Sequence, residues 1–170
     1  MGIEMVQTAF LADHADTIPT LAQWFHAQWP DYYAQQALSE IEQGFRVRMN
    51  RDRLPLGLVA FHAGELAGTI VLREQAIETH SQYRPGLGGL YVSAPLRCRG
   101  GGTELVRAGT VAARELGYEV VYTTTQVAGG ILMRLGWELK GSILHRGEQH
   151  ALYWCALTAP SEHEQPRVSD

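Results

Sequence analysis

The chain has 170 residues, 45% of them hydrophobic and 19% charged, with a formal net charge of −4. These values predict a globular protein with a buried core, and the weak negative charge argues against a basic face of the kind that binds nucleic acid. Cys98 and Cys155 lie far apart, which excludes a disulfide framework or a metal-binding cysteine cluster. No apolar run is long enough to span a membrane, and Glu4 stands where a signal peptide would be basic, so we expect a cytoplasmic protein.

The N-terminal region predicts a strand followed by a helix. Residues 3–11 alternate loosely between apolar and polar side chains, as strands do. Residues 17–28 have helical periodicity, with Asp16 as the expected N-cap and Pro19 in the first turn. One face of this helix carries apolar side chains that we assign to the core: Ile18, Leu21, Ala22, Phe25 and Trp29.

A second helix and a β-hairpin follow. Ser39 and Glu42 have the spacing of a capping box, which predicts a helix that runs to about Asn50. Residues 56–61 and 66–72 are two strand-like runs. The glycine between them predicts a hairpin turn.

The polar stretch of residues 73–86 connects this hairpin to the centre of the chain. It ends in a proline and a glycine, so we expect a loop. Three side chains that can exchange protons lie in it: Glu74, Glu78 and His80. Their simplest interpretation is solvated loop residues, just as His62 is expected to be exposed beside the hairpin turn, but their position before the central stretch makes them candidates for the chemistry.

Residues 90–106 are the stretch around which the chain is organised. A strand-like run meets a turn at Pro95, and then Arg97, Arg99 and the glycines at 100–102 precede a segment with helical periodicity. In such an arrangement the free N–H groups of the first helical turn and the positive end of the helix dipole can hold a phosphate. Glycine allows the anion to approach the main chain and tolerates positive φ. The alternative is a turn that only joins a strand to a helix.

Two common phosphate-binding loops do not fit this stretch. A Walker loop continues as Gly-Lys-Ser/Thr, whereas Gly102 is followed by Thr103 and Glu104. A dinucleotide-binding loop needs a different glycine spacing in the first βα unit. The sequence therefore disfavours nucleoside triphosphate hydrolysis and dinucleotide binding.

The C-terminal half predicts alternating helices and strands. Gly117 is a good C′ residue for the helix that follows the glycines. The run at residues 119–125 is rich in β-branched side chains, as expected of a buried parallel strand. The expected elements are a helix over residues 101–116, the strand over 119–125, a short helix over 126–135 ending before Gly136, and a hairpin of residues 137–144 and 150–157. Residues 159–170 are expected to form a mobile tail.

The central stretch resembles the pyrophosphate-binding loop of the GNAT acetyltransferases, (Gln/Arg)-x-x-Gly-x-(Gly/Ala), at Arg97, Gly100 and Gly102. A second GNAT-like segment has its corresponding residues at Ala128, Arg134, Leu135, Gly136 and Trp137, with Ile131 at the position where the family has phenylalanine. The resemblance covers nearly the whole chain, which is similar to a bacterial subgroup of small, single-domain GNAT enzymes. It implies an α/β (α+β) fold, a mixed central sheet of about six or seven strands flanked by about four helices, in a single domain over residues 1–158.

By this resemblance the ligand is acetyl-coenzyme A, and no metal is expected. Its pyrophosphate would lie on the backbone N–H groups of residues 99–103, and its pantetheine arm would pair with the end of the preceding strand. The residues implied in cofactor binding are Leu90, Tyr91, Val92, Arg97, Cys98, Arg99, Gly100, Gly101, Gly102, Thr103 and Thr125. The backbone N–H of Val92 would stabilise the oxyanion.

The sequence departs from the family pattern at two places. The tyrosine often proposed as the general acid corresponds to Leu132, and the strand position that commonly carries a basic carboxylate corresponds to Gly88 or Gly89. A coenzyme A thiol, with a pKa of roughly 8.5, can leave as a thiolate without much help. The candidate general bases are Glu74, Glu78 and His80, with Tyr91 and Tyr122 as alternative hydroxyls.

The leading hypothesis is an N-acetyltransferase that transfers the acetyl group of acetyl-coenzyme A to a primary amine of a small molecule by direct attack in a ternary complex. One alternative is a non-catalytic acetyl-coenzyme A sensor, which the two departures favour. Another is an acetyltransferase acting on a protein or peptide. We expect no nucleic-acid or membrane partner, and the last hairpin offers an edge for a homodimer.

Overall fold

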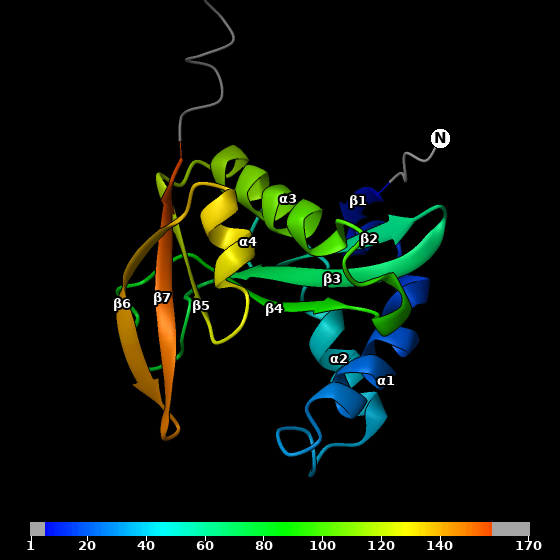
Figure 1. The fold of residues 1–170 in the computed structure, drawn as a ribbon. Helices are drawn as coiled ribbons and strands as arrows, with labels where there is room; N and C mark the ends of the chain where they lie inside the picture. Colours follow the sequence, from blue (N-terminus) through cyan, green and yellow to red (C-terminus); the bar gives the residue numbers. More distant parts are fainter. Residues whose placement is uncertain (1–5, 158–170) are drawn as a thin grey trace, which may run out of the picture. The chain divides into compact units, whose positions relative to one another are not determined.

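The computed structural model describes residues 6–157, which form seven strands and four α-helices (Figure 1). The strands are β1 (Val6–Phe10), β2 (Leu56–His62), β3 (Glu65–Arg73), β4 (Gly86–Val92), β5 (Val120–Thr125), β6 (Glu138–His145) and β7 (Glu148–Ala156). The helices are α1 (Ile18–Gln28), α2 (Leu38–Arg46), α3 (Gly101–Glu115) and α4 (Gly129–Arg134), with short 3₁₀ turns η1 (Leu11–Asp13), η2 (Ala15–Thr17) and η3 (Ala94–Leu96). The strand order is β1-β2-β3-β4-β5-β7-β6, and β4 and β5 are parallel. The mixed α/β fold expected from the sequence is confirmed.

The chain divides into two compact units, each described separately below. Within the described residues, the first comprises residues 6–71 and 89–105, and the second comprises residues 72–88 and 106–157. The boundaries fall inside β3, β4 and α3. A single domain over residues 1–158 stays a prediction, and the tail expected at 159–170 lies outside the described residues.

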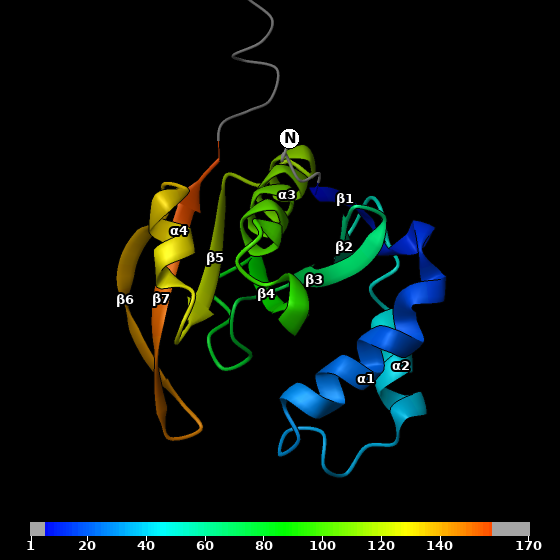
Figure 2. The same ribbon diagram turned by 45° about the vertical axis from the view of Figure 1, so that its right-hand side comes forward.

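In the first unit, α1 and α2 lie side by side and share a core with β2 (Figure 2). The predicted apolar face of α1 is buried at four of its five positions, and only Trp29 is partly exposed. The expectation that Asp16 caps this helix was wrong. Asp16 lies in η2, and the Thr17 hydroxyl donates a hydrogen bond to the His14 carbonyl, so a 3₁₀ turn replaces a side-chain cap.

The start and end of α2 also differ from the prediction. Ala37 precedes the helix, and its backbone N–H donates to the Glu40 carboxylate at 2.8 Å, whereas Glu42 pairs with Arg46. The expected Ser39–Glu42 capping box is therefore wrong by two residues. The helix ends at Arg46 because the chain then turns back and Met49 forms a β-bridge with Leu56.

The hairpin of β2 and β3 is confirmed, with Ala63 and Gly64 at positive φ (51° and 84°) in its turn. Such a turn matches the twist of the flanking strands. The prediction that His62 is exposed was wrong, because β1 pairs with β2 and places Val6 opposite His62, which is buried.

In the second unit, β7 pairs with both β5 and β6 in antiparallel fashion. The β6–β7 hairpin is confirmed, with Arg146 and Gly147 at positive φ. Helix α4 is shorter than expected, because the Thr125 hydroxyl accepts hydrogen bonds from the N–H groups of Val127 and Ala128. This local turn competes with the first turn of a helix.

Candidate functional site

The predicted anion loop lies entirely in the first unit, between β4 and α3. After η3, Arg97 is extended, Cys98 has a positive φ of 65° and Gly100 has a positive φ of 92°. The N–H of Glu104 donates to the carbonyl of Gly100 at 3.0 Å. The N–H groups of residues 101–103 therefore precede the first helical hydrogen bond and have no acceptor within α3. They form a donor set at the positive end of a helix dipole.

Gly100 and Gly101 differ in backbone conformation and in the space around the missing side chain. A side chain at Gly100 would meet nothing within 4 Å, so its left-handed backbone, and not space, favours glycine there. Gly101 is buried, and a Cβ atom on it would lie 3.7 Å from the Val92 side chain, which is ordinary contact. The left-handed conformation of Cys98, a residue that rarely adopts it, was not predicted from the sequence.

Arg97 fixes the end of β4. Its Nε donates a hydrogen bond of 2.7 Å to the Val92 carbonyl, and its guanidinium lies 5.5 Å from the centre of the Tyr91 ring. The next N–H, that of Ser93, donates to the Ala67 carbonyl of β3 at 2.8 Å. The peptide unit between residues 92 and 93 is thus held at both its carbonyl and its N–H.

The hydrogen bond from the Ser93 N–H to the Ala67 carbonyl shows which way the backbone groups at the end of β4 point. Along a strand, the backbone groups of successive residues point to alternate edges. Because Ser93 bonds to β3, the N–H groups of Leu90 and Val92 point to the edge turned away from β3. This is the orientation that the predicted pantetheine pairing and the oxyanion donor require.

Tyr91 belongs to an aromatic cluster. Its ring centre lies 5.3 Å from that of Trp24, 5.9 Å from Phe25 and 6.2 Å from Trp29. On the other side, a Cβ atom at Gly68 of β3 would lie 2.3 Å from the Tyr91 carbonyl oxygen. The backbone of β4 is thus held between a glycine of β3 and the hydrogen bond from Arg97, with the Tyr91 ring packed among aromatic side chains.

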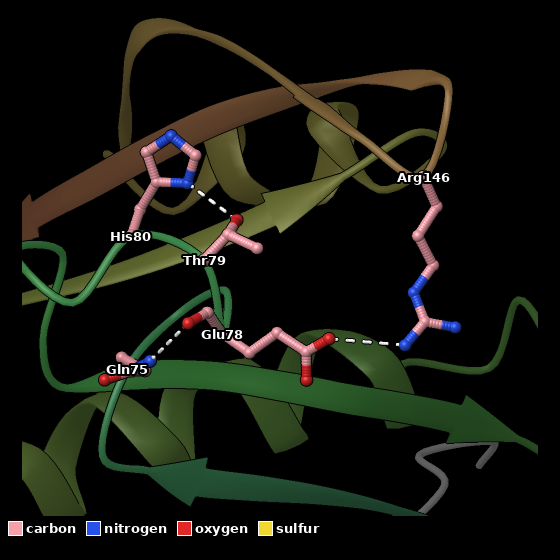
Figure 3. Close-up of polar contacts among 5 residues, drawn as sticks. All are labelled: Gln75, Glu78, Thr79, His80 and Arg146. Carbon is pink, nitrogen blue, oxygen red and sulfur yellow. Dashed lines mark hydrogen bonds and ion pairs between the residues drawn. The ribbon is translucent and has the colours of Figure 1, made fainter.

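The three candidate bases lie in the second unit, and the structure does not bring their side chains together. Glu74 pairs with Arg84 at 3.1 Å and Glu78 with Arg146 at 3.2 Å. His80 shares a hydrogen bond with the Thr79 hydroxyl, and Figure 3 shows its ring pointing away from the Glu78 carboxylate. Both carboxylates are exposed, so solvent screens their ion pairs.

By the resemblance described above, Gly88 and Gly89 are the two positions at which a basic carboxylate would be expected, and the surroundings of Gly88 are crowded. A Cβ atom there would lie 2.5 Å from the Arg73 guanidinium, which therefore occupies the space that a side chain would need. Leu132, at the usual tyrosine position, is only 2% exposed. The Arg73 contact was not predicted because it depends on β3 lying beside β4, and the Arg97 hydrogen bond was not predicted because it depends on how η3 and the extended Arg97 turn the chain back toward Val92.

Other reactive side chains of the described residues are dispersed. Both cysteines are free thiols, with Cys98 exposed in the loop. Burial, together with the Glu138 carboxylate, raises the pKa of the Cys155 thiol. No group of three or more His, Cys, Asp or Glu side chains is arranged to hold a metal ion within residues 6–157. No helix in this part of the chain combines the length and apolarity needed to cross a membrane.

A comparison with protein-family models finds one family. The model for the acetyltransferase (GNAT) family matches residues 18–137. A comparison with curated protein sequences finds no match.

Solved structures of acetyltransferases share the fold. The aminoglycoside acetyltransferase AAC(6')-Ib, in complex with coenzyme A and kanamycin, superposes with a TM-score of 0.69 and 15% identity over 89% of this chain and 95% of that one. A ribosomal-protein-alanine N-acetyltransferase from Brucella melitensis gives 0.67 and 18% over 90% and 99%. A putative acetyltransferase from Salmonella typhimurium, yncA, solved with its cofactor acetyl-CoA, gives 0.66 and 13% over 97% and 98%. At these identities the likeness concerns the fold.

Proposed function

Since the chain belongs to the GNAT family of acetyltransferases, we propose that it transfers the acetyl group of acetyl-coenzyme A to a primary amine of a small molecule within a ternary complex. The observation that carries this proposal is the loop between β4 and α3. It presents three N–H groups without helical acceptors directly after the left-handed Gly100.

The residues of the first unit fit the chemistry of coenzyme A. The N–H groups of residues 99–103 would bind the pyrophosphate, with the charges of Arg97 and Arg99 at the rim and Cys98 within the loop. The outward N–H groups of Leu90 and Val92 would pair with the pantetheine amides in the manner of an added strand. Thr125, also expected to contact the cofactor, belongs to the second unit, where its hydroxyl already accepts two hydrogen bonds and retains one proton to donate.

The bound cofactor supplies an acetyl thioester whose carbonyl carbon accepts the amine nitrogen. The Val92 N–H would donate to the oxyanion as the C–N bond forms and the C–S bond breaks. The amine proton must leave for solvent or for a base, and Glu74, Glu78 and His80 are the candidates that we retain. Their ion pairs and hydrogen bonds would have to open or be bridged by water before any of them accepted that proton.

Thermal unfolding with increasing acetyl-coenzyme A tests the binding step. At a concentration of 100 times Kd, linkage stabilises the native state by about 2.7 kcal/mol, which raises Tm by about 5–10 °C for a chain of this size. The test variant is Gly100→Val, and the matched control is Gly117→Val. Both glycines have positive φ (92° and 95°) and both have free space around the missing side chain, but Gly117 follows the C-terminus of α3.

We expect Gly100→Val to abolish the ligand-dependent shift and Gly117→Val to retain it. Equal shifts in both variants would mean that the loop does not bind the cofactor. Release of free thiol with a panel of small amines and short peptides then tests catalysis and separates small-molecule from peptide acceptors.

The second candidate function is a sensor that binds acetyl-coenzyme A without consuming it. The observation in its favour is Arg73, whose guanidinium occupies the space beside Gly88, one of the two strand positions (with Gly89) at which a catalytic carboxylate would be expected. A sensor would show the thermal shift but release no thiol with any acceptor. Release with one class of amine would refute it.

A further inference from the structure

Tyr153 of β7 is a buried tyrosine whose hydroxyl has no hydrogen-bond partner among the described residues. The residue is 8% exposed, and it lies opposite Thr123 of β5 and Leu139 of β6. A tyrosine hydroxyl usually has a partner when its ring is buried, because an unpaired hydroxyl loses the hydrogen bonds that it would form with water. An unpaired polar group of this kind calls for an explanation, and a catalytic role is one.

Helix α4 lies beside β7 (Figure 1), and the Tyr153 hydroxyl is next to its first turn. A Cβ atom on Gly129 would lie 2.6 Å from the hydroxyl oxygen and 3.4 Å from the Cζ atom of Tyr153. Real Cβ atoms do not approach another atom so closely, so a side chain at position 129 would push the hydroxyl away. Glycine at this position therefore keeps the space in which the hydroxyl lies.

Thr125 brings a second hydroxyl to the same part of the chain. It accepts hydrogen bonds from the N–H groups of Val127 and Ala128, and Ala128 immediately precedes Gly129. We expect Thr125 to contact the cofactor, and its hydroxyl retains a proton to donate. Both hydroxyls thus adjoin the turn that joins β5 to α4.

The place of the Tyr153 hydroxyl bears on the departure from the family pattern at Leu132. Gly129 and Leu132 are three residues apart on α4, so they lie on the same face of the helix. Helical side chains point toward the N-terminus of their helix, and a tyrosine at position 132 would extend over the turn that holds Gly129. The Tyr153 hydroxyl reaches this turn from β7, whereas Leu132 has no proton to donate.

We propose that Tyr153 is the general acid of the acetyl transfer, an inference that rests on the proposed function. Its hydroxyl donates a hydrogen bond to the coenzyme A sulfur and transfers its proton to that atom as the C–N bond forms and the C–S bond breaks. The tyrosinate then recovers a proton from solvent, which takes up the proton that the amine loses. The leaving group departs as a thiol.

The binding of two ligands tests the contact without any turnover. Coenzyme A and desulfo-coenzyme A, an analogue that lacks the sulfur, are compared by calorimetry near pH 8.5, roughly the pKa of a free thiol. We expect the native chain to bind coenzyme A about tenfold more tightly than the analogue, because a hydroxyl donates a strong hydrogen bond to a thiolate. Tyr153→Phe should bind both ligands equally.

Tyr118→Phe is the control, since it removes a hydroxyl from a half-buried tyrosine in the connection between α3 and β5. It should keep the tenfold preference for coenzyme A. A Tyr153→Phe variant with the same preference as the native chain would overturn the proposal.

Thermal unfolding and kinetics separate a catalytic hydroxyl from a structural one. Because the Tyr153 hydroxyl forms no hydrogen bond with the described residues, Tyr153→Phe should leave Tm unchanged or raise it. The rate of thiol release at saturating substrates should fall about tenfold, and the KM for acetyl-coenzyme A should stay the same. A lower Tm with an unchanged rate would make Tyr153 a structural residue.

Two glycines of α4 provide a matched pair that tests the position of the hydroxyl. Gly129→Ala places a methyl group against the Tyr153 hydroxyl, and the folded variant should lose the preference for coenzyme A. Gly130→Ala should retain it, because a Cβ atom on Gly130 would meet only the Arg134 guanidinium at 3.4 Å. An equal preference in both variants contradicts the assigned position.

The results also separate this inference from the proposed function. A native chain that releases thiol but does not distinguish coenzyme A from its desulfo analogue contradicts the role of Tyr153 and leaves the proposed function standing. A native chain that distinguishes the two ligands through Tyr153 but releases no thiol with any acceptor supports the contact between the hydroxyl and the sulfur and refutes the acetyl transfer.

Discussion

Replacing Gly68 by alanine should disturb the candidate site through the backbone alone. Gly68 lies on β3, and a Cβ atom on it would lie 2.3 Å from the Tyr91 carbonyl oxygen and 3.2 Å from the Val92 Cα atom. Ordinary contact begins at about 3.4 Å, so the end of β4 must move by roughly 1 Å. The atom in the way belongs to the backbone and cannot rotate aside.

Two measurable losses follow from that displacement. Overpacking of this kind costs about 1–3 kcal/mol, which lowers the urea midpoint and reduces Tm by about 2–4 °C per kcal/mol. The shift also displaces the Val92 carbonyl from Arg97 and moves the outward N–H of Val92. We therefore expect the affinity for acetyl-coenzyme A, measured by calorimetry on the folded variant, to fall about tenfold or more.

Gly44→Ala is the matched control for this substitution. Gly44 lies inside α2, and nothing lies within 4 Å of the added methyl group. Alanine in a helix interior is favoured over glycine by up to about 1 kcal/mol, so this variant should be as stable as the native chain or more stable. If Gly68→Ala also keeps native stability and native affinity, the close approach of β3 and β4 is not as described.

Three further outcomes are expected. Arg97→Met removes the hydrogen bond to the last carbonyl of β4 and should raise the Kd of acetyl-coenzyme A about tenfold in calorimetry; an unchanged Kd would remove Arg97 from the site. Thr123→Val removes the buried 2.6 Å hydrogen bond to the Leu87 carbonyl and should cost about 1–3 kcal/mol in urea unfolding, and native stability would contradict that role. Because burial and Glu138 raise the pKa of Cys155, its alkylation by iodoacetamide, followed by mass spectrometry of the labelled peptide, should reach half its maximal rate at a higher pH than an exposed cysteine does. Glu138→Gln should lower that midpoint, and a rise would reverse the assigned sign.

Local signals in the sequence predicted most elements well. The helix after the glycines was expected over residues 101–116 and is observed over Gly101–Glu115, since Gly117 adopts the positive φ of a C′ residue. Both hairpin turns were located from a glycine between alternating runs. These features depend on interactions within a few residues, which a sequence pattern encodes directly.

The errors have an equally physical cause. The pairs Ser39–Glu42 and Ala37–Glu40 have the same spacing, and the structure uses the second, in which only the Glu40 carboxylate caps. A pattern search favours the first because alanine has no side-chain acceptor. His62 was misplaced because its burial depends on β1, which is distant in the sequence.

In the candidate site, too, some features were predicted from the local sequence and others were not. The order of glycines and arginines indicated where an anion would bind, but not that Arg97 would donate to Val92 or that Arg73 would lie against Gly88. The candidate bases were chosen for their residue type and their place in one loop. Glu74 pairs with Arg84 and His80 with Thr79 inside the loop, whereas Glu78 pairs with Arg146, which is distant in the sequence, and the residue types alone did not identify these partners.

The peptide unit between Val92 and Ser93 also has a consequence for amide hydrogen exchange. The Ser93 amide donates to Ala67, its residue is buried, and its peptide carbonyl is held by Arg97, so its proton should exchange only when β4 separates from β3. A few residues along, the amides of Gly102 and Thr103 lack helical acceptors, and these residues are only half-buried, so their protons should exchange rapidly in the free protein. A ligand that binds the loop would slow these two protons while leaving the Ser93 amide as it was. Adjacent peptides of one segment thus provide both a reporter of binding and an internal reference.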